Sequence, residues 1–178
     1  MVAELLLQHP DEVSWSDAIV NENALQKTSV HSAKRMASTL RKRLEPMGRD
    51  FWTALLQVSD DLAKQMLLLA TICQSPVLGD FMATVVSDAR RMYRESLRSD
   101  DWQEFILSRQ RVVDGLEQFS ASSIQKMGNN VFKILADVGY LESGRSRKLQ
   151  NLYLLPEVRE WSMRLGCPKA YEAMESAR

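Results

Sequence analysis

The residues of this sequence whose types and spacing could do chemistry are basic, and most of them lie in one short segment. Residues 27–49 contain seven Lys and Arg and one acid, Glu45, whereas residues 1–26 contain five acids and neither Lys nor Arg. The charge therefore changes from −5 to +6 between neighbouring segments, although the whole chain is formally neutral. Such an asymmetry predicts a directional surface whose basic part meets a polyanion. The first candidate site comprises Lys27, His31, Lys34, Arg35, Arg41 and Lys42.

Helical spacing would give this basic segment one cationic face. Spacings of three, four and seven residues place His31, Lys34, Ser38 and Arg41 together on a helix. Long cations on one face can follow a phosphate backbone, so these residues are candidates for contact with nucleic acid. We expect Arg35, like Arg43, to pair with acids of the chain instead. The competing interpretation is a solvated surface whose bases pair with neighbouring acids.

A second basic constellation lies near the C-terminus. The segment ESGRSRK at residues 142–148 contains a turn glycine and three cations. The helix expected before it presents polar residues, including two lysines. The candidate residues of this second site are Lys126, Lys133, Arg145, Arg147 and Lys148.

Catalytic and metal chemistry finds little support. Two histidines and two cysteines, none at ligand spacing, do not suffice for a zinc site. No glycine-rich phosphate loop or nucleophile elbow is present. We interpret Cys73 as a small core residue and Cys167 as a residue near a helix end with nothing nearby to activate it. We therefore expect a protein that is not an enzyme and uses no metal, cofactor or small-molecule substrate.

The elements that position the first basic site resemble a helix-turn-helix. A cap at Ser14 or Ser16 predicts a helix to about residue 25, and Ser29 then caps a longer basic helix over 30–44. That helix carries an apolar stripe from Val30 through Met36 to Leu44. A short helix, a tight polar turn and a longer basic helix form a helix-turn-helix-like segment over 16–44.

The second basic site has the pattern of a winged helix. A cap at Ser122 or Ser123 starts a helix that Gly139 ends near residue 138. Residues 140–141 and 149–155 resemble two short strands around the basic loop, and we expect one small β-hairpin there. Helices over 157–165 and 168–177 follow. The hairpin would act as the wing beside a recognition helix.

The whole chain is expected to be mostly α, a compact helical bundle. It contains 178 residues, of which 45% are hydrophobic and 26% charged, as is typical of a packed soluble protein. Helices over 2–9, 51–58, 59–73, 77–98 and 100–110 fill the remainder. We predict an N-terminal helical domain over 1–118 and a C-terminal winged-helix-like domain over 119–178, packed together.

The expected location is the cytoplasm. The longest largely apolar stretch, residues 66–73, is far shorter than the roughly 20 residues that cross a bilayer. No signal segment opens the sequence, and two cysteines make no disulfide framework. We therefore expect neither a membrane span nor secretion.

Several motifs resemble those of the BrxA family of BREX bacteriophage-exclusion systems. The resemblance rests on WSDAI at 15–19, NALQK at 23–27, AKRMA at 33–37, RKRL at 41–44, LGDF at 78–81, VFKILADVGYL at 131–141 and LLPEV at 154–158. It implies a nearly all-helical fold likened to the antitermination factor NusB, and binding to double-stranded DNA within a multi-protein defence operon. Members usually carry more residues before the segment that matches residues 1–8. The family supplies no DNA-contacting residues, so the candidate sites rest on this sequence alone.

Together these patterns predict a non-enzymatic, double-stranded-DNA-binding accessory protein of a phage-defence system that contacts mainly the phosphate backbone. Other proteins of that system are expected partners. The alternative is a structural adaptor that binds those proteins with little affinity for nucleic acid. RNA binding would rest on likeness of fold alone, without an RNA-stacking aromatic motif.

Overall fold

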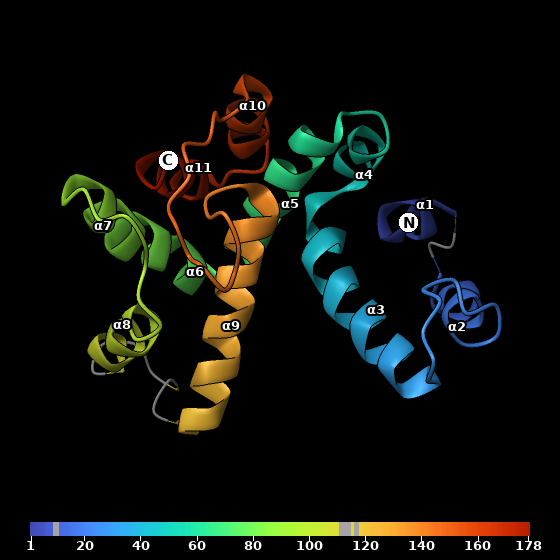
Figure 1. Cartoon of the computed structure of the whole chain (residues 1–178). Helices are drawn as coiled ribbons and strands as arrows, with labels where there is room; N and C mark the ends of the chain where they lie inside the picture. Colours follow the sequence, from blue (N-terminus) through green and yellow to red (C-terminus); the bar gives the residue numbers. More distant parts are fainter. Residues whose placement is uncertain (9–10, 111–114, 116–117) are drawn as a thin grey trace. The chain divides into compact units, whose positions relative to one another are not determined.

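The computed structural model describes residues 1–8, 11–110, 115 and 118–178, and this part of the chain is almost entirely helical (Figure 1). Its contacts divide it into two compact units, Met1–Met66 and Leu67–Arg178. This boundary differs from the expected one at residues 118/119, because α8 (Asp101–Arg109) packs on α9 (Ala121–Val138) within the second unit.

The first unit is built on α1 (Val2–Gln8), which packs against α2 (Glu12–Val20), α3 (Val30–Leu44) and α4 (Arg49–Leu55). A short 3-10 turn, η1 (Glu45–Met47), joins α3 to α4. The buried side chains include Leu6 of α1, Trp15 and Ile19 of α2, and Phe51 of α4. Each of these helices is too short to be stable alone, so burial of such apolar faces stabilises the unit. The unit boundary falls within α5 (Asp60–Gln74).

The second unit continues with α6 (Pro76–Phe81), the π-helical turn η2 (Met82–Val86) and α7 (Ser87–Arg91). The helices α10 (Pro156–Arg164) and α11 (Pro168–Ser176) close it, and α11 packs on α6 and η2. An aromatic cluster joins α6, α8 and α9. In it the ring of Phe81 meets those of Trp102, Phe105 and Phe132 at centroid distances of 5.2, 5.3 and 6.2 Å.

Close packing of α8 on α9 depends on a glycine. A Cβ at Gly128 would lie 2.6 Å from Cδ1 of Trp102, a distance that carbon atoms do not tolerate. The indole Nε1 of Trp102 donates to the carbonyl of Ile124, at 2.9 Å. The absence of a side chain at Gly128 therefore lets the ring reach the α9 backbone and satisfy its buried donor.

The buried carboxylate of Asp101 binds the segment that precedes α8. Asp101 accepts from the Arg94 Nη2 at 2.6 Å and from the backbone N–H of Arg98 at 2.7 Å, and its side chain is almost fully buried. Burial raises the pKa of Asp101, but the hydrogen bonds from Arg94 and Arg98 outweigh this and leave the pKa below its usual value. Asp101 is therefore a structural ion-pair residue at the start of α8.

Several sequence predictions about helix ends are confirmed. The helix α3 begins after Ser29, whose hydroxyl accepts from the Ser32 N–H at 3.2 Å, and it ends at Leu44. Gly139 ends α9 in the left-handed region, with φ 100°. At α9 the N-cap is Ser120 rather than Ser122 or Ser123.

The tight turn of a helix-turn-helix is a prediction that was wrong. Asp11 caps α2, not Ser14 or Ser16, and α2 ends at Val20 rather than near residue 25. Residues 21–29, nine in all, then connect α2 to α3, whereas a helix-turn-helix uses three or four. Asn23 and Gln26 adopt positive φ values of 49° and 50°, which interrupt any helix. The predicted order of a short helix followed by a longer basic helix is present, but the connection between the two helices is longer than predicted.

The predicted β-hairpin and wing were also wrong. In the described residues the pairing is limited to two isolated antiparallel bridges, Leu141 with Leu149 and Ser96 with Lys148. The backbone of residues 148 and 149 bonds to two different segments, since the Glu142 N–H donates to the Lys148 carbonyl at 2.9 Å and the Leu149 N–H donates to the Glu95 carbonyl at 3.0 Å. Neither pairing extends beyond a single bridge. The following backbone is held by a side chain, since Arg90 donates to the carbonyl of Gln150. The second basic site therefore lies on a loop and not on a wing.

Within the described residues no single helix combines the length and apolar composition of a membrane span. The segments Asp60–Gln74 and Pro76–Arg91 meet those two criteria only as a pair, bent by 110°.

Candidate nucleic-acid interface

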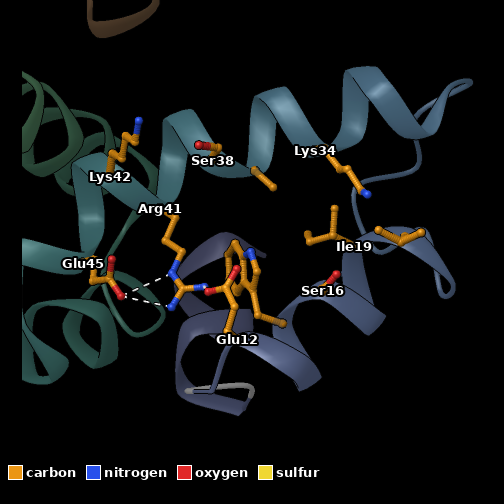
Figure 2. A pocket seen from close by; sticks show the side chains of 11 residues that line it. Glu12, Ser16, Ile19, Lys34, Ser38, Arg41, Lys42 and Glu45 are labelled. Carbon is orange, nitrogen blue, oxygen red and sulfur yellow. Dashed lines mark hydrogen bonds and ion pairs between the residues drawn. The ribbon is translucent and has the colours of Figure 1, made fainter.

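A groove between α2 and α3 forms the centre of the first basic site. It has a volume of about 490 Å³ and contains residues of both helices (Figure 2). The ring of Trp15 forms part of its wall, and the guanidinium of Arg41 lies 4.9 Å from the ring centroid. The two helices pack directly on each other, so this geometry lies wholly within the first unit.

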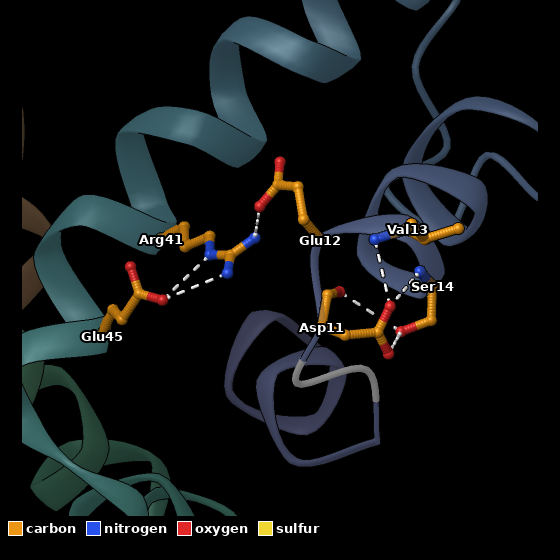
Figure 3. Close-up of polar contacts among 6 residues, drawn as sticks. All are labelled: Asp11, Glu12, Val13, Ser14, Arg41 and Glu45. Carbon is orange, nitrogen blue, oxygen red and sulfur yellow. Dashed lines mark hydrogen bonds and ion pairs between the residues drawn. The ribbon is translucent and has the colours of Figure 1, made fainter.

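Arg41 of α3 binds two carboxylates, one from α2 and one at the C-terminal end of its own helix. Its Nη1 lies 2.7 Å from Oε2 of Glu12, and its Nε and Nη2 both donate to Oε1 of Glu45, at 3.2 and 3.1 Å (Figure 3). The Arg41 side chain is only 15% exposed, whereas those of Glu12 and Glu45 are 81% and 53% exposed. The cation is thus mostly buried against Trp15, with its charge directed to acids at the surface.

The contacts of Arg41 and Arg35 within the protein therefore differ from the expected ones. Arg41 was expected to face phosphates, but its donors are occupied within the protein. Arg35 was expected to pair with acids, yet it is exposed and forms no ion pair with any residue that the structure describes. Only the packing of α2 on α3 brings Glu12 to Arg41, 29 residues away in sequence. The pairing with Glu45, in contrast, has the i, i+4 spacing that sequence reasoning can identify.

The solvent-facing side of α3 presents a continuous polar stripe. His31, Arg35, Ser38 and Lys42 recur at intervals of four, three and four residues, and all four are exposed. Lys34 is exposed beside the stripe, at the groove. In Figure 2, Lys42 extends away from α2 while Arg41 points toward it. Ser38, a neutral donor, lies between the cations. The stripe and Lys34 form the α3 patch, which contains three cations and a histidine.

Lys27 belongs to the connection before α3 and is only partly exposed. Its backbone N–H donates to Oδ1 of Asn23 at 2.9 Å, and Nδ2 of Asn23 donates back to the Lys27 carbonyl at 3.1 Å. This reciprocal pair fixes the shape of the connection. Lys27 therefore flanks the α3 patch without being on the helix.

The second basic site lies in the other unit, where the 142–148 loop rests on α9. A Cβ at Gly144 would lie 3.5 Å from the Lys133 Cα, so the loop backbone reaches the helix surface there. Internal hydrogen bonds hold the loop. The Ser143 hydroxyl accepts from the Ser146 N–H at 2.9 Å, and the Ser143 carbonyl accepts from the Arg147 N–H, also at 2.9 Å.

Two of the three loop cations are engaged within the protein. The guanidinium of Arg147 lies 4.8 Å from the ring centroid of Phe132, and its buried Nε has no hydrogen-bond partner among the described residues. The Nζ of Lys148 lies 3.6 Å from Oε1 of Glu95. Arg145, in contrast, is exposed and forms no ion pair with a described residue. Of the three loop cations, Arg145 is thus the one that can meet an external anion without breaking an internal contact.

The exposed face of α9 supplies the rest of this site. Lys126 and Lys133 are seven residues apart on one face, with Asn129 and Asn130 between them, and all four are exposed. Lysine and asparagine side chains donate hydrogen bonds to phosphate oxygens. With Arg145 these residues form the α9 patch. Sequence reasoning identified its three cations, while the engagement of Arg147 and Lys148 follows from tertiary contacts.

The remaining feature is the grouping of side chains that could bind a metal ion. Among the residues that the structure describes, no group of three or more His, Cys, Asp or Glu side chains could hold a metal ion.

Comparison with known proteins gives one consistent family. The BrxA family model matches residues 1–166. A protein of Escherichia coli O9:H4 (strain HS), named BREX protein BrxA, is 43% identical over 178 residues, which is 100% of this chain and 84% of the relative. A second BREX protein BrxA, from Paramagnetospirillum magneticum (strain ATCC 700264 / AMB-1), is 34% identical over 89% of this chain and 79% of its own.

A solved structure matches the fold. The crystal structure of an uncharacterized protein from Magnetospirillum magneticum has a TM-score of 0.87 and 29% sequence identity, over 97% of this chain and 88% of that one. The helical architecture described above is therefore one that a natural relative adopts.

Proposed function

The chain belongs to the BrxA family, and from that premise we propose that it serves a BREX phage-defence system as a non-enzymatic protein that binds duplex DNA through its phosphate backbone. Membership of the family places the chain among BREX proteins, and a role in phage defence follows from it. DNA binding is the further step, and it rests on the surface of the molecule.

The observation that carries the proposal is the distribution of ion pairs around α3. Glu12 of α2 and Glu45 at the end of α3 are both bound by the single residue Arg41. Lys34, Arg35 and Lys42 therefore keep their charge without an acidic partner among the described residues. Exposed cations on one helix that no carboxylate neutralises are available to an external anion, and the phosphates of DNA supply regularly spaced anions.

The same patches predict how DNA is bound. Neither patch carries a cluster of Arg, Asn and Gln long enough to read an extended specific site in the major groove. We therefore expect nearly sequence-independent binding, with a dissociation constant of roughly 10⁻⁴–10⁻⁶ M at physiological salt. The logarithm of the affinity should fall by about 0.9 per logarithmic unit of salt for each phosphate that is neutralised.

A charge-reversal experiment tests this proposal. The triple variant Lys34→Glu, Arg35→Glu, Lys42→Glu should weaken binding to all duplex sequences alike and flatten the salt slope by about three units. The matched control reverses three other exposed cations, Arg49, Arg159 and Lys169.

Both variants change the net charge equally, so the control separates local contact from the general field of the protein. Binding should be measured by gel shift and fluorescence anisotropy on duplex DNA, single-stranded DNA and RNA of equal length. Retention of wild-type affinity and salt slope in the folded α3 triple variant would contradict the proposal, and so would a preference for RNA.

An adaptor role is the second candidate, and one surface feature favours it. Met92 and Tyr93 are 73% and 95% exposed directly after α7, and Tyr93 adopts a φ of 53°. Arg90 on one side and Arg94 on the other are both bound within the protein, which holds the turn between them. Exposed Tyr and Met side chains on a held turn are typical of protein contacts. Capture of another BREX protein that is lost in a Tyr93→Ser variant, with no salt-dependent DNA binding, would favour the adaptor role.

A further inference from the structure

The two cysteines of the chain lie together in the second unit. Cys73 belongs to the last turn of α5 and Cys167 is the N-cap residue of α11, so 94 residues separate them in sequence (167 minus 73). Both are half-buried, and both line one cavity of about 620 Å³. Within this cavity the Cys167 thiol is close enough to that of Cys73 to help raise the Cys73 pKa. Sequence reasoning treated the two residues separately, since nothing in their spacing indicates that they share a cavity.

The backbone around both residues is held in place. The Cys167 N–H donates to the carbonyl of Ser162 at 2.8 Å, and the Cys167 carbonyl accepts from Ala170 at 3.0 Å. On the other side, α6 begins three residues after Cys73, and it packs on α11. A Cβ at Gly79 of α6 would lie 2.7 Å from Cγ2 of Ile72, so the turn from α5 to α6 is close-packed beside the thiol. Packed elements therefore hold both cysteines at the wall of the same cavity.

The surroundings of the pair favour the protonated thiol of Cys73 and leave the cavity accessible to small molecules. Burial, followed by the interaction with Cys167, raises the pKa of the Cys73 thiol to about 12, so Cys73 is a neutral thiol at physiological pH. The cavity walls are mainly apolar, with Pro76, Ala83 and Ala170 among them. A small uncharged oxidant can enter such a cavity without losing strong interactions with water.

We propose that Cys73 and Cys167 form an oxidisable dithiol, which a peroxide-class oxidant converts into an intramolecular disulfide between the end of α5 and the start of α11. The sulfur of Cys167 attacks the peroxide oxygen, which gives a sulfenic acid and releases one water. The sulfur of Cys73 then attacks that of Cys167, and the Cys73 proton leaves with the sulfenic hydroxyl as a second water. Two thiols lose two electrons and two protons, and hydrogen peroxide becomes two waters.

The disulfide would have a measurable effect on the fold. It closes a long loop and so reduces the freedom of the unfolded chain, which should raise the melting temperature by roughly 5–10 °C. A small dithiol such as dithiothreitol should reverse the change, because thiol–disulfide exchange restores both thiols. In a reducing compartment such a pair is a transient, reversible modification site and not a permanent cross-link.

The test uses the unsubstituted chain of 178 residues, treated with hydrogen peroxide and then alkylated under denaturing conditions. The expected result is the loss of both alkylatable thiols, a monomer on a non-reducing gel, and a proteolytic peptide pair joined through Cys73 and Cys167. Thiols that stay alkylatable, cysteines oxidised to sulfinic acid without a cross-link, or a disulfide between chains would each overturn the proposal.

Single substitutions assign the order of attack. In Cys73→Ser, peroxide should leave a sulfenic acid at Cys167 that dimedone traps, whereas in Cys167→Ser the buried Cys73 should react much more slowly. The reverse order of reactivity would overturn the assigned roles. Cys73→Ala serves if the serine variant does not fold. The α3 charge-reversal variant should still form the disulfide, so this test is independent of DNA binding.

Discussion

Replacement of Arg41 by Ala tests the division of labour on α3 most directly. The change removes ion pairs to Glu12 and Glu45 and the contact with the Trp15 ring. Each pair with an exposed carboxylate contributes about 0.3–1 kcal/mol, and a cation–π contact at a partly exposed site contributes about 0.5–1 kcal/mol. Lost packing of the buried stem adds to this, so Arg41→Ala should lower the free energy of unfolding by about 1–3 kcal/mol.

The comparison variant is Arg35→Ala, on the same helix. Arg35 is exposed and has no ion pair with a described residue, so its removal should change stability by less than about 0.5 kcal/mol. It should nevertheless weaken DNA binding and flatten the salt slope by about one unit, because it removes one phosphate contact. Arg41→Ala should do the opposite. It destabilises the protein, and the fraction that stays folded should keep nearly wild-type affinity.

The assay combines urea unfolding with a salt titration of DNA binding on both variants. For a chain of this size, 1–3 kcal/mol corresponds to a fall in melting temperature of about 3–10 °C. Arg41→Lys should be intermediate, because lysine keeps the charge but cannot bind Glu45 through two nitrogens as arginine does. The reasoning fails if Arg35→Ala is as destabilising as Arg41→Ala, or if folded Arg41→Ala loses DNA affinity and Arg35→Ala does not.

Three further predictions concern the second unit. Arg147→Ala should lower the melting temperature while DNA affinity stays unchanged, because its guanidinium covers the ring of Phe132; a loss of affinity in the folded variant would place Arg147 at the interface. Gly128→Ala should cost about 1–3 kcal/mol in urea unfolding, because its methyl group would overlap the Trp102 ring, and an unchanged midpoint would refute that packing. The lowered pKa of Asp101 means that its stabilisation is complete above the ordinary carboxyl pKa of about 3.9 and is lost as the pH falls through the folded-state value. Asp101→Asn should therefore be less stable at pH 7 and lose less additional stability on acidification, as measured by urea unfolding at several pH values.

The sequence by itself determined the helical class and many of the helix limits. Serine caps and glycine stops are local signals, since they act through backbone groups within one turn, and they located the start of α3 and the end of α9. The exposed face of α9 that carries Lys126 and Lys133 was also identified from sequence, because long polar side chains on a regular helix have a predictable face.

Tertiary structure decided which way α3 faces. The sequence pattern placed Val30 and Met36 in the apolar stripe, but both are about half exposed, and the buried residues are Ala33, Ala37 and Leu44. Small side chains at a helix contact let a neighbouring helix approach, and α2 with its buried Trp15 packs there. The packing of α2 determines which side of α3 is buried. Helical spacing alone therefore could not show which arginine of α3 is bound within the protein and which is exposed.

Long-range contacts also determine why the predicted hairpin does not form and why the two cysteines lie at the same cavity. Residues 140–155 have the alternation of strands, yet Arg90 of α7 binds the backbone carbonyl of Gln150, and the pairings of Leu141 with Leu149 and of Ser96 with Lys148 do not extend beyond single bridges. The cavity lined by Cys73 and Cys167 likewise brings together residues 94 positions apart. Local propensity and periodicity report on neighbours within a few residues, whereas partners brought together by packing depend on the whole fold.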